Sequence, residues 1–122
     1  MSGTDDDAAR AERAVEVGAI DAVGFDPDAD ITFVAVPVLA ITAAVKQALA
    51  STRGVVTDVG SVKAPIVQAV GDARFIGGHP MAGSEQEGLD GADPSMFEGA
   101  VWVLTPTHDT DDDALAMLAA VV

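Results

Sequence analysis

The feature of this 122-residue chain that most restricts its fold is a series of short apolar runs separated by stretches of helical composition. The runs are "ADITFVAVPV" (29–38), "GVVTDVGS" (54–61), "ARFIGG" (73–78) and "AVWVLTP" (100–106). Continuous β-branched and apolar runs of this kind are typical of strands buried on both faces. Their alternation with helices predicts an α/β fold, a parallel sheet with helices on both faces.

The predicted helices follow from composition and from residues typical of helix ends. The expected ranges are 8–17, 38–50, 62–70 with Pro65 in its first turn, and a last helix with Thr110 as N-cap. Asp5, Asp6 and Asp7 suit the positive start of the first helix, and Gly18 ends it. A short strand is expected at 22–25. The absence of repeats and linkers predicts one domain.

The charge balance limits the partners of the chain. There are 20 acidic residues, 15 of them Asp, against 6 basic ones, giving a formal net charge of -14. This field repels phosphate backbones and anionic lipid headgroups, so we expect no nucleic-acid partner and no membrane partner. The same excess would repel itself in dilute salt and be screened in concentrated salt, which favours a salt-rich cytoplasm.

Other compositional features favour a soluble cytoplasmic protein. The chain has no cysteine, hence neither disulfides nor thiolate metal ligands. The acidic N-terminus "MSGTDDDAAR" does not resemble a secretory signal. The longest apolar stretch, 31–45, is too short to span a bilayer and contains Pro37.

Polar residues follow the predicted strands where ligands bind in such sheets, at the carboxyl ends. Pro37, Ser61 and His79 are therefore expected on one edge of the sheet, called the carboxyl rim below. A neutral imidazole held there accepts a proton near physiological pH. Gly77 and Gly78 would allow another group to approach the backbone closely. The alternative is that His79 is a capping or core residue.

Several neighbouring residues have two interpretations. Ser61 is expected to face the ligand cleft, to cap the following helix, or both. Lys63 would neutralise an anionic ligand or pair with a surface aspartate. Ser84 and Glu85 bind substrate or hold their glycine-bounded loop in place.

No metal ligation is expected, and the second histidine and the tryptophan have structural interpretations. The spacing of His79, Glu85 and Asp90 matches no metal-ligand pattern, so we expect no metal site. His108 is expected to be a solvent-exposed loop residue, and Trp102 a core residue.

Asp5 is a candidate cofactor residue. In dinucleotide-binding folds an acid after the second strand hydrogen-bonds the adenine ribose. Because three consecutive aspartates also complement a helix dipole, both interpretations remain open.

The segments "TDVGSVKAPIV" (57–67), "RFIGGHPMAGSEQEGLDGADPSMFEGAVWVLTPT" (74–107) and "FVAVPV" (33–38) together resemble the nucleotide-binding domain of the prephenate and arogenate dehydrogenase family. The resemblance covers nearly the whole chain. It implies a Rossmann-like sheet and NAD- or NADP-dependent oxidative decarboxylation of prephenate to 4-hydroxyphenylpyruvate, in tyrosine biosynthesis.

The resemblance also implies roles for individual residues. His79 is the base that accepts a hydrogen bond from the ring hydroxyl, and Ser61 bridges histidine, hydroxyl and nicotinamide. Ser84 and Glu85 line the substrate pocket. The cofactor contacts are Asp5 at the ribose, and Val36, Pro37 and Ser61.

No G-x-G-x-x-G loop occurs in the sequence. By the resemblance, the first strand that precedes this loop and the helical dimerisation domain of the family are expected to be missing as well. Residues 1–122 are therefore expected to form a partial NAD(P)-binding domain, and full-length relatives to be homodimers. Two alternatives remain: a non-catalytic fragment, and an arogenate dehydrogenase.

Overall fold

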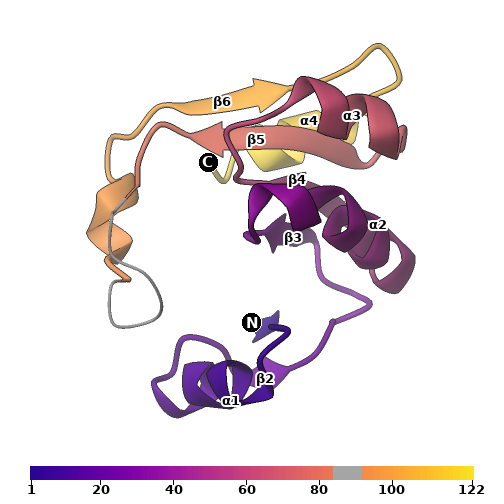
Figure 1. Ribbon diagram of the computed structural model, residues 1–122. Helices are drawn as coiled ribbons and strands as arrows, with labels where there is room; N and C mark the ends of the chain where they lie inside the picture. The colour runs from indigo at the N-terminus through magenta and orange to yellow at the C-terminus, as the bar shows by residue number, and fades with distance from the viewer. Residues whose placement is uncertain (84–91) are drawn as a thin grey trace.

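The computed structural model describes residues 1–83 and 92–122, whose strands form two sheets (Figure 1). The smaller sheet pairs β1 (Ser2–Gly3) in parallel with β2 (Ala22–Val23), and α1 (Ala8–Glu16) connects them. Strand β1 was not predicted, because two residues are too few to show a hydrophobic period.

The predicted first helix is confirmed, including its ends. Asp7 is the N-cap of α1, and its carboxylate accepts a hydrogen bond from the backbone N–H of Ala9 at 3.0 Å. Gly18 follows the last turn with a φ of 74°, a conformation that favours glycine. The N-terminal ammonium of Met1 forms an ion pair with Asp21 next to β2.

The larger sheet contains four strands in the order β3-β4-β5-β6. Their bounds are β3 Ile31–Val34, β4 Val55–Asp58, β5 Phe75–Pro80 and β6 Trp102–Thr105. The strands β3, β4 and β5 are parallel, as predicted. Strand β6 is antiparallel to β5, which corrects the prediction of a wholly parallel sheet. An apolar run predicts a strand and does not encode its direction. Nor is β6 buried on both faces as expected, since none of its four residues is fully buried.

Helices cover both faces of this sheet, as predicted (Figure 1). On one face α2 (Ile41–Ser51) and α3 (Ala64–Val70) pack over Val56 and Phe75. On the other face α4 (Asp112–Ala119) packs over Val55 and Ile76. Short 3-10 helices lie in the connections, among them η1 (Val38–Ala40) and η3 (Pro94–Phe97).

The start of α4 differs from the prediction. Asp111 is the N-cap, and its carboxylate accepts a hydrogen bond from the Ala114 N–H at 2.8 Å. The hydroxyl of Thr110, the predicted cap, instead accepts a hydrogen bond from the Thr107 N–H at 2.8 Å. The Thr110 hydroxyl therefore stabilises the turn before the helix, and Asp111 caps the helix.

Among the described residues, no helix has the length and apolar character needed to cross a membrane.

Candidate active site

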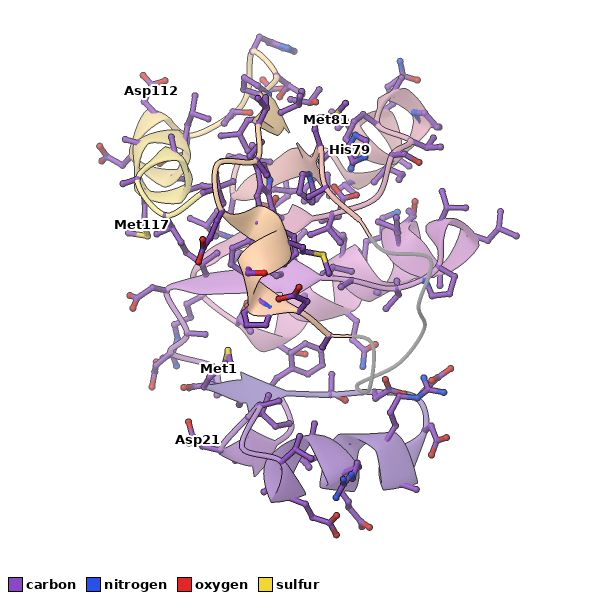
Figure 2. All side chains as sticks on the ribbon, turned by 90° about the vertical axis from the view of Figure 1, so that its left-hand side faces the viewer. Met1, Asp21, His79, Met81, Asp112 and Met117 are labelled. Atoms are coloured by element: carbon purple, nitrogen blue, oxygen red, sulfur yellow. The ribbon has the colours of Figure 1, made fainter. Side chains whose placement is uncertain are left out.

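The structure brings Pro37, Ser61 and His79 to the carboxyl rim. Pro37 follows β3, Ser61 follows β4, and His79 is the penultimate residue of β5. Because β3, β4 and β5 are parallel neighbours, these positions share one edge of the sheet. His79 is half-buried and lies next to Met81, well away from α4 (Figure 2).

His79 lies inside the strand, although the sequence placed it just beyond. Strand β5 continues to Pro80 because it pairs with β6, where His79 is opposite Val103. The imidazole is thus carried by a paired strand. A side chain on a rigid element is positioned more accurately than one on a loop.

The buried carboxylate of Asp58 is the main polar group beneath the rim, and sequence reasoning missed it. Asp58 is the last residue of β4 and is 0% exposed. It accepts hydrogen bonds from the backbone N–H groups of Gly60 at 3.1 Å and Gly78 at 3.3 Å. The signal was available: a lone aspartate in the apolar run "VVTDV", five residues before one of only two lysines.

Lys63 pairs with this buried carboxylate. Its ammonium forms an ion pair with Asp58 and donates a hydrogen bond to the Gly78 carbonyl oxygen at 2.8 Å. The Lys63 side chain is 14% exposed. The partner is therefore a buried aspartate, neither the surface acid nor the anionic ligand that the sequence suggested.

Close contacts within the protein explain Gly78. A Cβ atom there would lie 2.6 Å from the Asp58 carbonyl oxygen and 2.7 Å from the Thr57 hydroxyl. The backbone of β5 thus needs a glycine in order to lie against the end of β4. The sequence suggested that a glycine here lets another group approach the backbone, and at Gly78 that group is the end of β4.

Ser61 is exposed and does not cap the following helix. The N-cap position of α3 is Lys63, and it has no side-chain cap hydrogen bond. Within residues 1–83 and 92–122, no hydrogen bond joins the side chains of Ser61 and His79. The capping interpretation of Ser61 is therefore wrong, and its pairing with His79 stays a prediction.

Asp5 lies between β1 and α1, at the position expected for a ribose-binding acid. Its carboxylate accepts a hydrogen bond from the Asp7 N–H at 2.9 Å and one from the Arg10 guanidinium at 3.1 Å. The Asp7 N–H and the Arg10 charge lower the pKa of Asp5, so the group is an ionised acceptor at neutral pH. This chemistry fits a ribose hydroxyl donor.

The remaining cofactor candidates, Val36 and Pro37, lie in the exposed turn between β3 and η1. An exposed turn beyond a strand's carboxyl end suits contact with a bound nucleotide. Ser84, Glu85 and Asp90 lie outside the described residues. Among the described residues, no cluster of three His, Asp or Glu side chains suits a metal ion.

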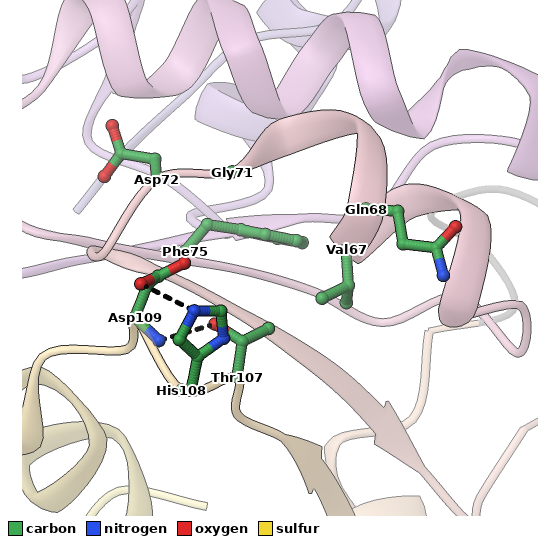
Figure 3. A pocket seen from close by; sticks show the side chains of 8 residues that line it. All are labelled: Val67, Gln68, Gly71, Asp72, Phe75, Thr107, His108 and Asp109. Carbon is green, nitrogen blue, oxygen red and sulfur yellow. Dashed lines mark hydrogen bonds and ion pairs between the residues drawn. The ribbon is translucent and has the colours of Figure 1, made fainter.

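A pocket of about 270 Å³ lies at the opposite end of the sheet from the carboxyl rim (Figure 3). Phe75, the first residue of β5, and Thr107, just after β6, line it together with His108. The His108 side chain is 90% exposed and pairs with Asp109 at 3.1 Å, as expected for a loop residue. This pocket is separate from the candidate site.

Trp102 is half-buried and lies outside both clusters of buried core residues, so the prediction of a core residue is wrong; it packs instead against two exposed aromatic rings. Its ring lies 6.0 Å from that of Phe33 and 5.9 Å from that of Phe97, centroid to centroid. Its buried indole nitrogen has no hydrogen-bond partner among the described residues.

Parallel strands covered by helices on both faces, with polar residues at their carboxyl ends, define an α/β nucleotide-binding domain. The whole chain, residues 1–122, matches the family model "Prephenate dehydrogenase, nucleotide-binding domain". The chain belongs to this family, and the resemblance seen in the sequence is confirmed.

Known relatives agree with this assignment. A prephenate dehydrogenase of Bacillus subtilis (strain 168) is 41% identical over 68 residues, 52% of this chain and 18% of the relative. The arogenate dehydrogenase structure from Synechocystis superposes with a TM-score of 0.86 at 36% identity, over 99% of this chain and 46% of that one. The prephenate dehydrogenase from Aquifex aeolicus, solved with hydroxyphenyl propionate and NAD+, gives 0.85 at 30% identity, over 98% and 46%.

The chain therefore spans less than half the length of these relatives. It corresponds to a portion of each that includes the described sheet.

Proposed function

We propose that this chain contributes the cofactor site and the catalytic histidine of an NAD- or NADP-dependent dehydrogenase of tyrosine biosynthesis. The reaction is the oxidative decarboxylation of prephenate to 4-hydroxyphenylpyruvate. The proposal rests on one observation: strand β5 holds His79 at the same carboxyl rim as Ser61. The relative solved with NAD+ and a hydroxyphenyl ligand supports the cofactor and the class of substrate.

The chemistry assigned to the chain is proton transfer and orientation. His79 accepts the proton of the ring hydroxyl while the carbon bearing that hydroxyl loses hydride and the ring carboxylate leaves as carbon dioxide. The nicotinamide supplies the hydride acceptor when bound. Ser61 bridges the imidazole and the hydroxyl. Ser84 and Glu85 line the substrate pocket.

The cofactor's other end is assigned to three residues. The ionised carboxylate of Asp5 accepts hydrogen bonds from the adenine ribose hydroxyls. Val36 and Pro37 contact the adenosine and pyrophosphate from the turn after β3. The likeness to the Synechocystis enzyme favours arogenate as the alternative substrate.

The test is nicotinamide reduction by the purified chain, with prephenate and with arogenate, for each cofactor. Circular dichroism first establishes folding. The fluorescence of Trp102, the only tryptophan, is then followed while the cofactor is added. We expect reduction that requires substrate. A folded chain without turnover for either substrate would contradict the proposed activity and support the non-catalytic alternative.

We also propose that the protein works in a salt-rich cytoplasm. The formal net charge of -14 repels itself, and molar salt shortens the screening length to about 3 Å. We expect the melting temperature to be several degrees higher in molar KCl than in dilute buffer, because each kcal/mol gained raises it by roughly 4–8 °C. An unchanged or lower melting temperature in KCl would contradict this prediction.

The homodimer implied for full-length relatives stays a prediction. The expectation that nucleic acids and membranes are not partners rests on the same negative charge.

A further inference from the structure

The backbone ladder between β4 and β5 ends before β5 does. The residues paired between them are Val56 with Phe75 and Thr57 with Ile76, whereas β5 continues to Pro80. Successive residues of a strand direct their backbone groups to opposite sides. Those of Gly78 face β4, past the last ladder pair.

Asp58 and Lys63 supply the missing partners of Gly78. The Gly78 N–H donates to the Asp58 carboxylate at 3.3 Å, and the Gly78 carbonyl accepts from the Lys63 ammonium at 2.8 Å. The two side chains also form an ion pair with each other. Because Gly78 is buried, its backbone groups need such partners. The ion pair therefore continues the β4–β5 connection after the backbone ladder has stopped.

The same carboxylate also holds the loop that carries Ser61. Its second oxygen accepts a hydrogen bond from the Gly60 N–H at 3.1 Å. Gly60 directly precedes Ser61, just as Gly78 directly precedes His79. One buried carboxylate thus binds the backbone immediately before each of the two proposed active-site residues.

Packing leaves this arrangement little freedom to shift. A Cβ atom at Gly60 would lie 2.4 Å from the Ile41 side chain and 3.2 Å from the Asp58 carboxylate. Asp58 is fully buried. A hydrogen bond to an ionised group is stronger than one between neutral groups, and a low-dielectric interior strengthens it further.

We propose that Asp58 and Lys63 are positioning residues that fix the separation and orientation of Ser61 and His79. The proposal rests on the function assigned to these two residues. Neither Asp58 nor Lys63 is assigned contact with substrate or cofactor. A purely stabilising ion pair would affect the whole fold equally, whereas a positioning pair acts selectively at Gly60 and Gly78.

Amide hydrogen exchange of the wild-type chain is the first measurement. Gly60 lies outside every strand, so its hydrogen bond to Asp58 predicts exchange at least roughly tenfold slower than in an unstructured peptide. Gly78 is expected to behave likewise. Unprotected amides at both positions would overturn the proposal, even if no variant could be made.

The second measurement uses Asp58→Asn/Lys63→Met, which removes both charges and so leaves neither one buried and unpaired. We expect the Gly60 and Gly78 amides to exchange faster by roughly tenfold or more relative to the Val56 amide. Val56 is the internal reference because its N–H bonds to the Arg74 carbonyl at 3.0 Å in the same ladder. Equal acceleration at all three amides would overturn the proposal.

The control is Asp28→Asn/Arg53→Met, which removes an ion pair whose side chains are 77% and 78% exposed. This pair lies near the opposite end of β4, so it should leave the Gly60 and Gly78 amides unchanged. Faster exchange at both glycines in the control would overturn the proposed selectivity of Asp58 and Lys63.

Turnover provides a readout that a structural role would not change. In Asp58→Asn/Lys63→Met we expect kcat per folded molecule to fall by about 10²-fold, with a smaller change in the KM for nicotinamide, because misplacement by about 1 Å costs that much. An unchanged kcat would overturn the proposal. A wild-type chain without turnover would contradict the proposed function instead, and amide exchange would still decide whether the ion pair holds the two glycines.

Discussion

Gly54→Ala is expected to destabilise the fold by more than about 3 kcal/mol, beyond the usual range for overpacking. A Cβ atom at Gly54 would lie 2.2 Å from the Ala29 carbonyl oxygen and 2.3 Å from that of Asp30. Both atoms belong to the backbone that leads into β3, so no side-chain rotation relieves the contact. The free energy of unfolding, from urea titration, measures the loss.

The surroundings of Gly54 explain why the backbone does not move aside. The Val55 N–H donates to the Asp30 carbonyl at 2.9 Å, which joins β4 to β3 at this point. The Arg74 guanidinium donates to the carbonyl oxygens of Thr52 at 2.9 Å and Gly54 at 3.4 Å. Moving the segment would break these hydrogen bonds.

Gly3→Ala is the matched control for Gly54→Ala. The nearest atom to its Cβ, at 3.2 Å, belongs to the Ile20 side chain, which adjusts more easily than backbone. We expect a smaller loss there, within about 1 kcal/mol. Equal losses for the two variants would contradict the argument from backbone contact.

His79→Asn is expected to lower kcat by roughly 10²- to 10⁴-fold, the contribution typical of a positioned general base. Asparagine keeps a polar side chain of similar reach but accepts no proton at neutral pH. The experiment is the nicotinamide-reduction assay, run at saturating prephenate after circular dichroism has shown the same fold.

His108→Asn is the control for His79→Asn, because it changes the only other histidine. That side chain is 90% exposed and lies at the far end of the sheet. Its kcat should equal that of the wild type. Full activity in His79→Asn, or equal losses in both variants, would contradict the role assigned to His79.

Much of the fold was predictable from sequence, because local patterns reflect local physics. The apolar runs gave the strands from β3 to β6 in the right order. The predicted β3, β4 and β6 were three to six residues too long, whereas β5 has the predicted length but begins and ends two residues later. Composition and end residues gave the four α-helices to within about three residues. Strand β1 and the direction of β6 were not predictable, since neither leaves a periodic signal.

The sequence predicted which residues lie at the candidate site, but not the hydrogen bonds and the ion pair that hold them in place. The carboxyl-rim argument placed Pro37, Ser61 and His79 together, because parallel strands end at one edge. It left the partner of Lys63 open and did not single out Asp58. Hydrogen bonds between residues 15 or 20 positions apart depend on the register of β4 against β5, which sequence patterns do not specify.

The sequence by itself determined the alternation of strands and helices, the acidic surface and the family of the chain. These follow from side-chain chemistry and from motifs read along the chain. Only the tertiary structure decided that β6 runs antiparallel, that Ser61 does not cap α3, and that Asp58 and Lys63 hold Gly60 and Gly78. These features require segments distant in sequence to meet, and their geometry exists only once the sheet has formed.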